Sequence, residues 1–204
     1  MPVQQIIIRS LSGYLFVIPM LIFYWIALFR TGNKQSLLRI VAILAFGYYL
    51  IGVLTVTGIH ELKAFSPRLV LVPFLDMIRD PMDTVLNIIL FLPFGFFLPL
   101  LYRKYNRAIQ VVFAGFLLSL SIEVLQMFGM GTTDINDLIT NTIGAFLGYG
   151  IYTVLSNVTP QGVCGRFYAA ADHEQKELLL LVVYSFAIMV TVQPVVVSRL
   201  FGLG

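Results

Sequence analysis

The stretch TVLNIILFLPFGFFLPLLY, which runs from Thr84 to Tyr102, decides the fold class of this chain. It holds 19 residues and no charged side chain. A helix needs roughly 20 predominantly apolar residues to cross the hydrocarbon core of a bilayer. The stretch therefore predicts a transmembrane helix. Pro93 near its middle predicts a bend, because proline removes a backbone hydrogen bond from the helix.

Similar apolar stretches lie on both sides of the first one. The last of them, Leu178–Val197, is apolar enough to cross but carries Gln193 and Pro194 near its end. The sequence therefore predicts an all-α fold, with a single transmembrane domain over residues 1–204 that is a polytopic membrane bundle of five to six helices. The four remaining helices are expected at about Leu11–Phe29, Ile40–Ile59, Ala108–Phe128 and Leu138–Ser156.

The composition agrees with a membrane protein and excludes several other classes. Hydrophobic residues make up 59% of the chain, charged residues make up 11%, and the mean hydropathy is +0.92. Soluble domains carry about a quarter charged residues. The net charge of +3 is small and scattered, so no nucleic-acid partner is expected. Cys164 is the one cysteine, which excludes an internal disulfide bond.

The loops between the expected helices differ in their basic residues, and this difference predicts the orientation. Cytoplasmic loops carry an excess of lysine and arginine. The first, third and fifth loops are therefore placed in the cytoplasm, with the N-terminus outside. The second loop, 60–83, weakens this pattern because it carries Lys63, Arg68 and Arg79. The first loop holds Arg30, Lys34 and Arg39, the third holds Arg103, Lys104 and Arg107, and the fifth holds Arg166 and Lys176.

Two loop segments have expected structures of their own. Leu69–Met77, in the second loop, is apolar but too short to cross, so it is expected at the membrane interface. The fifth loop is the one sizeable polar stretch predicted inside, and its charged residues are expected to form a solvated helix start. These residues are Asp172, Glu174, Lys176 and Glu177.

Polar residues gather in three of the expected helices. Their spacings of three, four or seven residues place each set on one face of its own helix. Three consecutive helices run up, down and up, so all three sets fall on the same side of the membrane, which the loop charges predict to be outside. Polar groups within a membrane helix are costly, so they are treated as functional candidates. The sets are Asp83 and Asn87, then Ser119, Glu123 and Gln126, then Asp134, Asp137 and Asn141.

Each of these residues also has a purely structural interpretation. The aspartates could cap helix N-termini, and the asparagines could hold helices together by hydrogen bonds. Gly144 and Gly148 continue the face of Asn141 with a spacing that lets two helices approach closely. Glu123 is the hardest to explain structurally, because an ionisable group inside a helix needs a partner, water or a proton.

At these residues the sequence resembles the VanZ-like family of bacterial membrane proteins. The resemblance covers about 71–152 and rests on three motifs in the same order and spacing. One feature departs from the family: many members carry an arginine in the loop before the paired aspartates, and here 129–133 reads GMGTT. A charge partner for Asp134 or Glu123 is then missing or comes from Arg68 or Arg79. The motifs are Asp83 and Asn87 followed by IILFLPFG, then Glu123 and Gln126, then TDINDLITNTIG over 133–144.

The resemblance implies a multi-pass protein of the bacterial cell membrane that acts in the cell envelope. The family takes its name from an accessory protein associated with resistance to teicoplanin, a lipoglycopeptide antibiotic, and a contribution to such resistance is one expectation. The three sets of polar residues are expected to bind an amphiphile: a membrane lipid, a lipid-linked cell-wall precursor or a lipoglycopeptide. Asn87, Gln126 and Asn141 would meet its head, and Phe91, Phe94 and Phe128 would line its tail.

Two other functions stay open at this stage. The first is a membrane-embedded enzyme in which Glu123, Asp134 and Asp137 hold a divalent cation beside a lipid head group. The second is a small proton-coupled transporter with Glu123 as proton carrier, although no comparable acid is expected in the inner half of any helix. No cofactor is expected, no residue is assigned a catalytic or metal-binding role, and the oligomeric state is left open.

Overall fold

The structure is a computed structural model that describes residues 2–32, 35–59, 65, 68–70, 72–74, 81–128, 132–168 and 171–202. Of residues 69, 161 and 171–173 the backbone alone is described. Lys34, Arg79, the loop residues 129–131 and, within the interfacial segment predicted over Leu69–Met77, residues 71 and 75–77 lie outside the described residues.

Six helices are long and apolar enough to cross a membrane in the part of the chain that the structure describes. The prediction of an all-α membrane bundle is therefore confirmed, and the sixth apolar segment is helical throughout. Its helix begins at Ala171, before the predicted start at Leu178, because the charged residues of the fifth loop continue the same helix. The six helices are α1 (Val3–Arg30), α2 (Leu37–Val56), α4 (Pro81–Leu101), α5 (Ala108–Gln126), α6 (Ile135–Val158) and α8 (Ala171–Phe201).

Short elements connect the long helices. Two strands of two residues each, β1 (Leu69–Val70) and β2 (Thr133–Asp134), pair in parallel, with Leu69 opposite Thr133 and Val70 opposite Asp134. The strands come from loops that are far apart in the sequence, so they join the segment before α4 to the segment before α6. The remaining elements are η1 (Arg103–Tyr105), α7 (Gln161–Cys164) and η2 (Gly165–Phe167).

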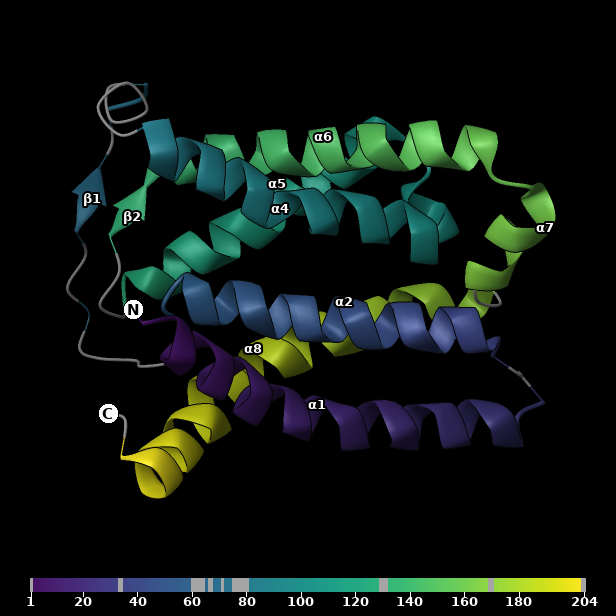
Figure 1. The fold of residues 1–204 in the computed structure, drawn as a ribbon, viewed down its shortest axis with the longest axis horizontal. Coiled ribbons are helices and arrows are strands. Elements are labelled where there is room, and N and C mark those ends of the chain that lie inside the picture. Colours follow the sequence, from purple (N-terminus) through teal and green to yellow (C-terminus); the bar gives the residue numbers. More distant parts are fainter. Residues whose placement is uncertain are drawn as a thin grey trace.

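Successive long helices run in opposite directions along the long axis of the molecule (Figure 1). The starts of α4 and α6, the end of α5, the two strands and both chain ends lie at one end of the bundle. The connection from α1 to α2 and the short helix α7 lie at the other end. This arrangement places the predicted polar sets of α4, α5 and α6 at one common end, as the alternation of directions requires.

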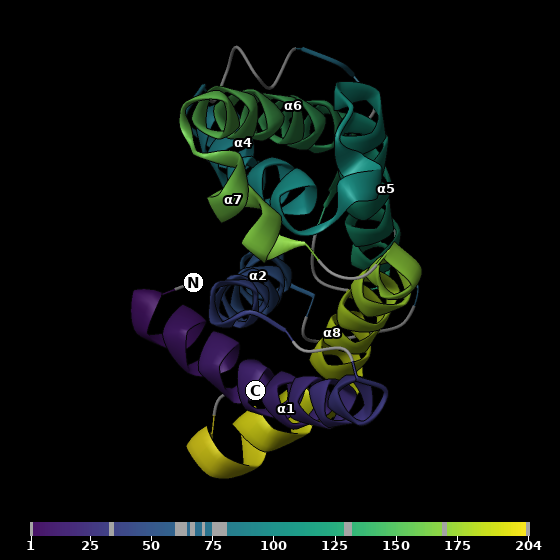
Figure 2. The same cartoon turned by 90° about the vertical axis from the view of Figure 1, so that its right-hand side faces the viewer.

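The bundle consists of two groups of three helices. Helices α4, α5 and α6 pack on one another, and so do α1, α2 and α8, while contacts between α2 and α4 join the groups. Figure 2 shows the two groups one above the other, with α2 on the side of its own group that faces α4. Tyr49 of α2 donates a hydrogen bond to the carbonyl of Leu90 on α4, at 2.8 Å, and so links the groups near the middle of the bundle.

The contact between α4 and α6 is close because glycines replace side chains there. A Cβ atom on Gly144 would lie 2.3 Å from the carbonyl oxygen of Ile88, and one on Gly148 would lie 2.1 Å from that of Leu92. Gly95 of α4 contributes from the other side, since its Cβ would meet the carbonyl oxygen of Ala145. Such distances are shorter than any real contact, so the predicted packing role of Gly144 and Gly148 is confirmed.

Pro93 lies inside α4, which continues from Pro81 to Leu101. The residues on either side of this proline pack into the core. Phe91 is fully buried and Phe94 is 3% exposed, and both rings belong to the central hydrophobic cluster. Phe91 is therefore a packing residue, and the expectation that it lines the tail of a bound amphiphile is wrong. Phe94 also lines a cavity between α5 and α8, so its expected role stays a prediction.

A candidate polar site where α4, α5 and α6 meet

Glu123 fastens the end of α5 to the start of α6. It lies in the last turn of α5 and is 4% exposed. Its Oε2 atom accepts a hydrogen bond from the backbone N–H of Asp134 at 2.8 Å. The hydroxyl of Thr133 donates to the backbone carbonyl of Glu123 at 3.0 Å. The buried carboxylate thus has a defined partner, and that partner is a backbone amide.

Asp134 has the capping role that its position allowed. It is the N-cap of α6, and its Oδ1 atom accepts from the backbone N–H of Asn136 at 2.8 Å. Asp137 follows in the first turn of α6, where the helix dipole favours a negative charge. Both side chains are half-buried, so they form the accessible rim of the site.

Asn87 and Asp137 meet across the close contact between α4 and α6. The side-chain amide of Asn87 donates to Oδ1 of Asp137 at 2.6 Å. Asp83 lies one turn earlier, in the first turn of α4, with its side chain exposed. The predicted sets of α4 and α6 therefore face each other, and the hydrogen bond supports the interpretation of Asn87 as an interhelical link.

Two further buried side chains of the site are amides. Asn141 of α6 donates to the hydroxyl of Ser119 on α5 at 3.0 Å, and Gln126 donates to the backbone carbonyl of Thr57 at 2.9 Å. The side-chain oxygens of Asn141 and Gln126 are buried and have no partner within the described residues. Each oxygen is a free acceptor, which a water molecule or a donor group of a ligand would satisfy.

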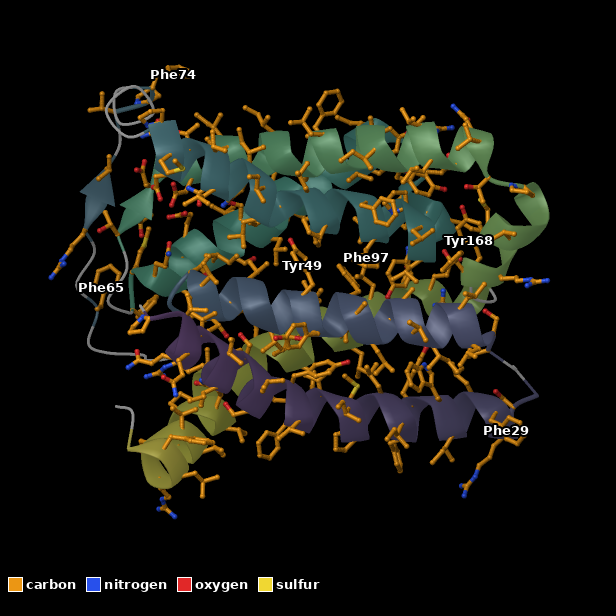
Figure 3. All side chains as sticks on the ribbon, viewed as in Figure 1. Phe29, Tyr49, Phe65, Phe74, Phe97 and Tyr168 are labelled. Atoms are coloured by element: carbon orange, nitrogen blue, oxygen red, sulfur yellow. The ribbon has the colours of Figure 1, made fainter. Side chains whose placement is uncertain are left out.

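Asn136 is a member of the cluster that the sequence reasoning missed. It is 4% exposed, its Oδ1 atom accepts from the backbone N–H of Phe74 at 2.7 Å, and its amide donates to the carbonyl of Val72 at 3.2 Å. Phe74 has a φ of 68°, a conformation that is costly for a bulky residue and requires support from its surroundings. Asn136 therefore holds the chain before α4 over this end of the bundle, where Figure 3 labels Phe74.

The signal for Asn136 was present but ambiguous. It stands between two aspartates in TDIND, and helical spacing from Asn136 leads to Thr140 rather than to the predicted polar face. Its partners are backbone atoms of a loop more than 60 residues away in the sequence. Side-chain spacing alone carries no information about such a contact.

No arginine in the described part of the chain forms an ion pair with Glu123, Asp134 or Asp137. Arg68 is exposed, and no ion pair joins it to Glu123 or Asp134. Its backbone carbonyl instead accepts from the N–H of Thr133 at 2.8 Å, as part of the strand pairing. Arg79, the other suggested partner, lies outside the described residues.

The described residues include no group of three or more His, Cys, Asp or Glu side chains arranged to hold a metal ion. Glu123, Asp134 and Asp137 are neighbours, but they are engaged with a backbone N–H, the α6 cap and Asn87, respectively. This geometry weighs against the cation-dependent enzyme, because hard cations need several oxygens converging on one point. We call the residues of the three predicted polar sets, together with Asn136, the polar cluster. Its members are Asp83, Asn87, Ser119, Glu123, Gln126, Asp134, Asn136, Asp137 and Asn141.

A buried ion pair occupies the opposite end of the bundle. Arg39 of α2 and Glu177 of α8 are 2.5 Å apart, and their side chains are 0% and 1% exposed. Arg39 also donates to the backbone carbonyls of Leu101 at 2.9 Å and Phe167 at 2.6 Å, and it lies over the ring of Tyr102. The guanidinium group thus ties together α2, α4, η2 and α8.

This ion pair corrects three expectations. Glu174 and Glu177 are not part of a solvated helix start, because α8 begins at Ala171 and turns both carboxylates into the bundle. Arg39 is not a loop cation, because it lies in the first turn of α2 after the Ser36 cap. The expectation that the inner half of the bundle lacks a buried acid is therefore wrong as well. The spacing of Glu174, Glu177 and Leu181 on one helix face is the signal that could have shown it.

The fold and the buried polar groups define a multi-pass α-helical membrane protein. Comparison with known families makes the assignment specific: the model of the VanZ/LLP1 family matches residues 16–156, so the chain belongs to this family. A curated relative, the protein VanZ of Enterococcus faecium, is 42% identical over 67 residues. That match covers 32% of this chain and 41% of the relative, so less than half of the relative's length is spanned. No solved structure matches the chain.

Proposed function

We propose that this protein acts in the bacterial cell envelope by binding an amphiphile at the polar cluster, and that it contributes in this way to teicoplanin tolerance. Membership of the VanZ/LLP1 family supports the envelope role. Candidate amphiphiles are a membrane lipid, a lipid-linked cell-wall precursor and a lipoglycopeptide. The predicted orientation places the cluster on the outer side of the membrane, where such molecules have their polar heads.

The observation that carries the proposal is the pair of free acceptors inside the cluster. The side-chain oxygens of Asn141 and Gln126 are buried without a partner among the described residues. The cluster also holds three aspartates, of which Asp83 is exposed and Asp134 and Asp137 are half-buried. Oxygens of this kind accept hydrogen bonds and attract cations, so the cluster suits a head group rich in hydroxyl, amide N–H or ammonium donors.

Asp137→Asn gives a sharp test, because asparagine keeps the oxygen that accepts from Asn87 and removes the charge. A susceptible bacterial host would express the chain or this variant, and the minimum inhibitory concentration of teicoplanin would be measured. We expect tolerance with the unaltered chain and its loss with Asp137→Asn at equal folded yield. Arg30→Gln, at the opposite end of the bundle, is the matched control and keeps tolerance.

A second glycopeptide without a lipid tail separates amphiphile binding from a general change of the envelope. The proposal expects protection against teicoplanin and little protection against the tailless drug. Equal protection against both drugs, or full tolerance with Asp137→Asn, Glu123→Gln and Asn141→Ala, would rule out the polar cluster as the binding site.

Proton-coupled transport remains the second candidate, and one observation favours it. Glu123 and Glu177 place a buried carboxyl group near each end of the bundle. A proton carrier at one end alone would not provide a pathway across the membrane. Liposomes that contain the protein and a trapped pH dye would measure proton flux under an imposed gradient. Flux that Glu123→Gln abolishes would favour the transporter, and its absence in well-folded protein would exclude it.

A further inference from the structure

A groove runs along the outside of the bundle between α5 and α8. These two helices belong to different three-helix groups and make few direct contacts. Two adjoining cavities of about 440 and 530 Å³ lie between them and share Leu117, Ser121, Val182 and Phe186 as lining residues. Cavities of this size lie in the range of small-molecule binding sites.

The groove follows the depth of the membrane. On α5 its lining extends from Ala114 to Leu125, which is about 16 Å at the rise of an α-helix. This length is close to half of a hydrocarbon core of about 30 Å, so it corresponds to one leaflet. The lining is apolar over this distance, and the hydroxyl of Ser121 is already bonded to the carbonyl of Leu117. A hydrocarbon chain is the partner that such a surface takes.

The end of the groove near the start of α8 is polar and positively charged. Lys104 of η1 lines the groove there, together with Gln175 at the start of α8. Arg103 and Arg107 are exposed in the same short connection between α4 and α5. The acidic side chains described at this end of the bundle, Glu174 and Glu177, are both buried and so do not neutralise that surface.

We propose that the groove between α5 and α8 binds an anionic phospholipid, with one acyl chain against Leu117, Val182 and Phe186 and the phosphate beside Lys104. The positive-inside pattern places this end in the cytoplasm, and the cytoplasmic leaflet is the one that carries anionic lipids. The lipid fills a surface that neither helix covers, and it stabilises the junction of the two helix groups. The proposed phosphate position lies at the opposite end of the bundle from the polar cluster, whereas the apolar part of the groove reaches Leu125 near that cluster. The inference does not depend on the proposed function.

The test compares phosphatidylglycerol with phosphatidylcholine of the same acyl chains. Full-length protein in mild detergent is titrated with each lipid, and bound lipid is counted by native mass spectrometry alongside the melting temperature. The proposal expects phosphatidylglycerol to be retained and to raise the melting temperature more than phosphatidylcholine. Lys104→Gln is expected to weaken phosphatidylglycerol binding about five-fold, as the loss of one cation near a phosphate predicts.

Two matched pairs of variants separate this site from general effects of charge and folding. Arg30→Gln removes one charge at the same end of the bundle but away from the groove, and it should leave binding unchanged. Ser121→Phe fills the groove without changing charge and should displace the lipid, whereas Ile151→Phe, on an exposed face of α6, should not.

Three results would overturn the proposal. Equal retention of the two lipids would remove the preference for an anionic head group. Equal effects of Lys104→Gln and Arg30→Gln, or lipid retention in Ser121→Phe, would place the lipid elsewhere. A cysteine at Ser121, introduced in a Cys164→Ser background, that cross-links two chains in native membranes would show that a second copy fills the groove.

Discussion

The two ends of the bundle bury polar groups in opposite ways. At one end Arg39 and Glu177 neutralise each other, and the guanidinium group also bonds two backbone carbonyls. At the other end the carboxylates of Glu123, Asp134 and Asp137 bond amides, and none of the three forms an ion pair with a described residue. The first arrangement pairs its two charges, although Arg39 Nε and Glu177 Oε2 have no hydrogen-bond partner among the described residues. The second has no ion pair among the described residues and leaves the side-chain oxygens of Asn141 and Gln126 without a partner.

This difference teaches that burial alone does not identify a functional polar group. Removing one member of a buried ion pair leaves an uncompensated charge, so the pair acts as a structural clamp. Carboxylates and amides that share weaker hydrogen bonds contribute less to stability, and their free atoms can still accept a ligand. The ion pair should therefore dominate measurements of stability, and the polar cluster should dominate measurements of function.

The largest expected effect is that of Glu177→Ala. It leaves Arg39 charged and fully buried, and we expect a loss of about 3–5 kcal/mol in the free energy of unfolding. Reversible unfolding in mixed micelles measures it. The double variant Arg39→Met, Glu177→Leu should recover most of the loss, because apolar residues of similar volume replace the pair. Lys176→Ala, at an exposed neighbouring position, is the control. A loss below 1 kcal/mol would contradict the clamp.

Gly148→Ala should have the next largest effect. Its Cβ would lie 2.1 Å from the carbonyl oxygen of Leu92, so α4 and α6 must separate, and we expect a loss of about 1–3 kcal/mol. Gly150→Ala, two residues along the same helix, meets no atom within 4 Å and is the matched control. It should be neutral or stabilising by up to about 1 kcal/mol. Thermal unfolding of both variants gives the comparison, and equal melting temperatures would contradict the close contact.

Asn136→Ala should act locally at the polar-cluster end. It removes the hydrogen bonds to Phe74 and Val72, and we expect a loss of about 1–2 kcal/mol. Hydrogen exchange should show faster exchange at Phe74 and in the strand pairing, with α1 and α2 unaffected. Asn157→Ala, near the other end of α6 and exposed, is the control. Uniform acceleration across the whole protein would show that Asn136 supports the entire fold instead.

Ser119→Ala should have the smallest effect. It removes the buried hydrogen bond from Asn141, and such bonds between membrane helices contribute about 0.6 kcal/mol on average. Ser121→Ala on the same helix removes a hydroxyl that bonds only the carbonyl of Leu117, and it should be neutral. Unfolding in mixed micelles compares the two. A loss as large as that of Glu177→Ala would erase the distinction between the two ends.

Much of the fold and part of the site could be predicted from the sequence. Six apolar stretches predicted five to six membrane helices, because in a bilayer the length and polarity of a segment nearly fix its structure. The polar residues of α4, α5 and α6 were placed at one end because consecutive membrane helices alternate in direction. Gly144 and Gly148 were identified as packing residues from their spacing.

The errors arose where a residue's partner is far away in the sequence. Glu177 was predicted to be solvated because its neighbours are charged, but the start of α8 at Ala171 turns it into the bundle. Phe91 was predicted to line the tail of a ligand, but it is buried in the core. In both cases the outcome depended on which helix packs against the residue.

The sequence by itself determined that this chain is a helical membrane protein with polar groups gathered at one end. Composition and helical period suffice for that, because they act within single segments. Only the tertiary structure decided that Arg39 meets Glu177 across 138 positions, that Asn136 holds a distant loop, and that α5 and α8 leave a groove between them. These features depend on the relative rotation and offset of the helices, which the packing of the whole bundle sets.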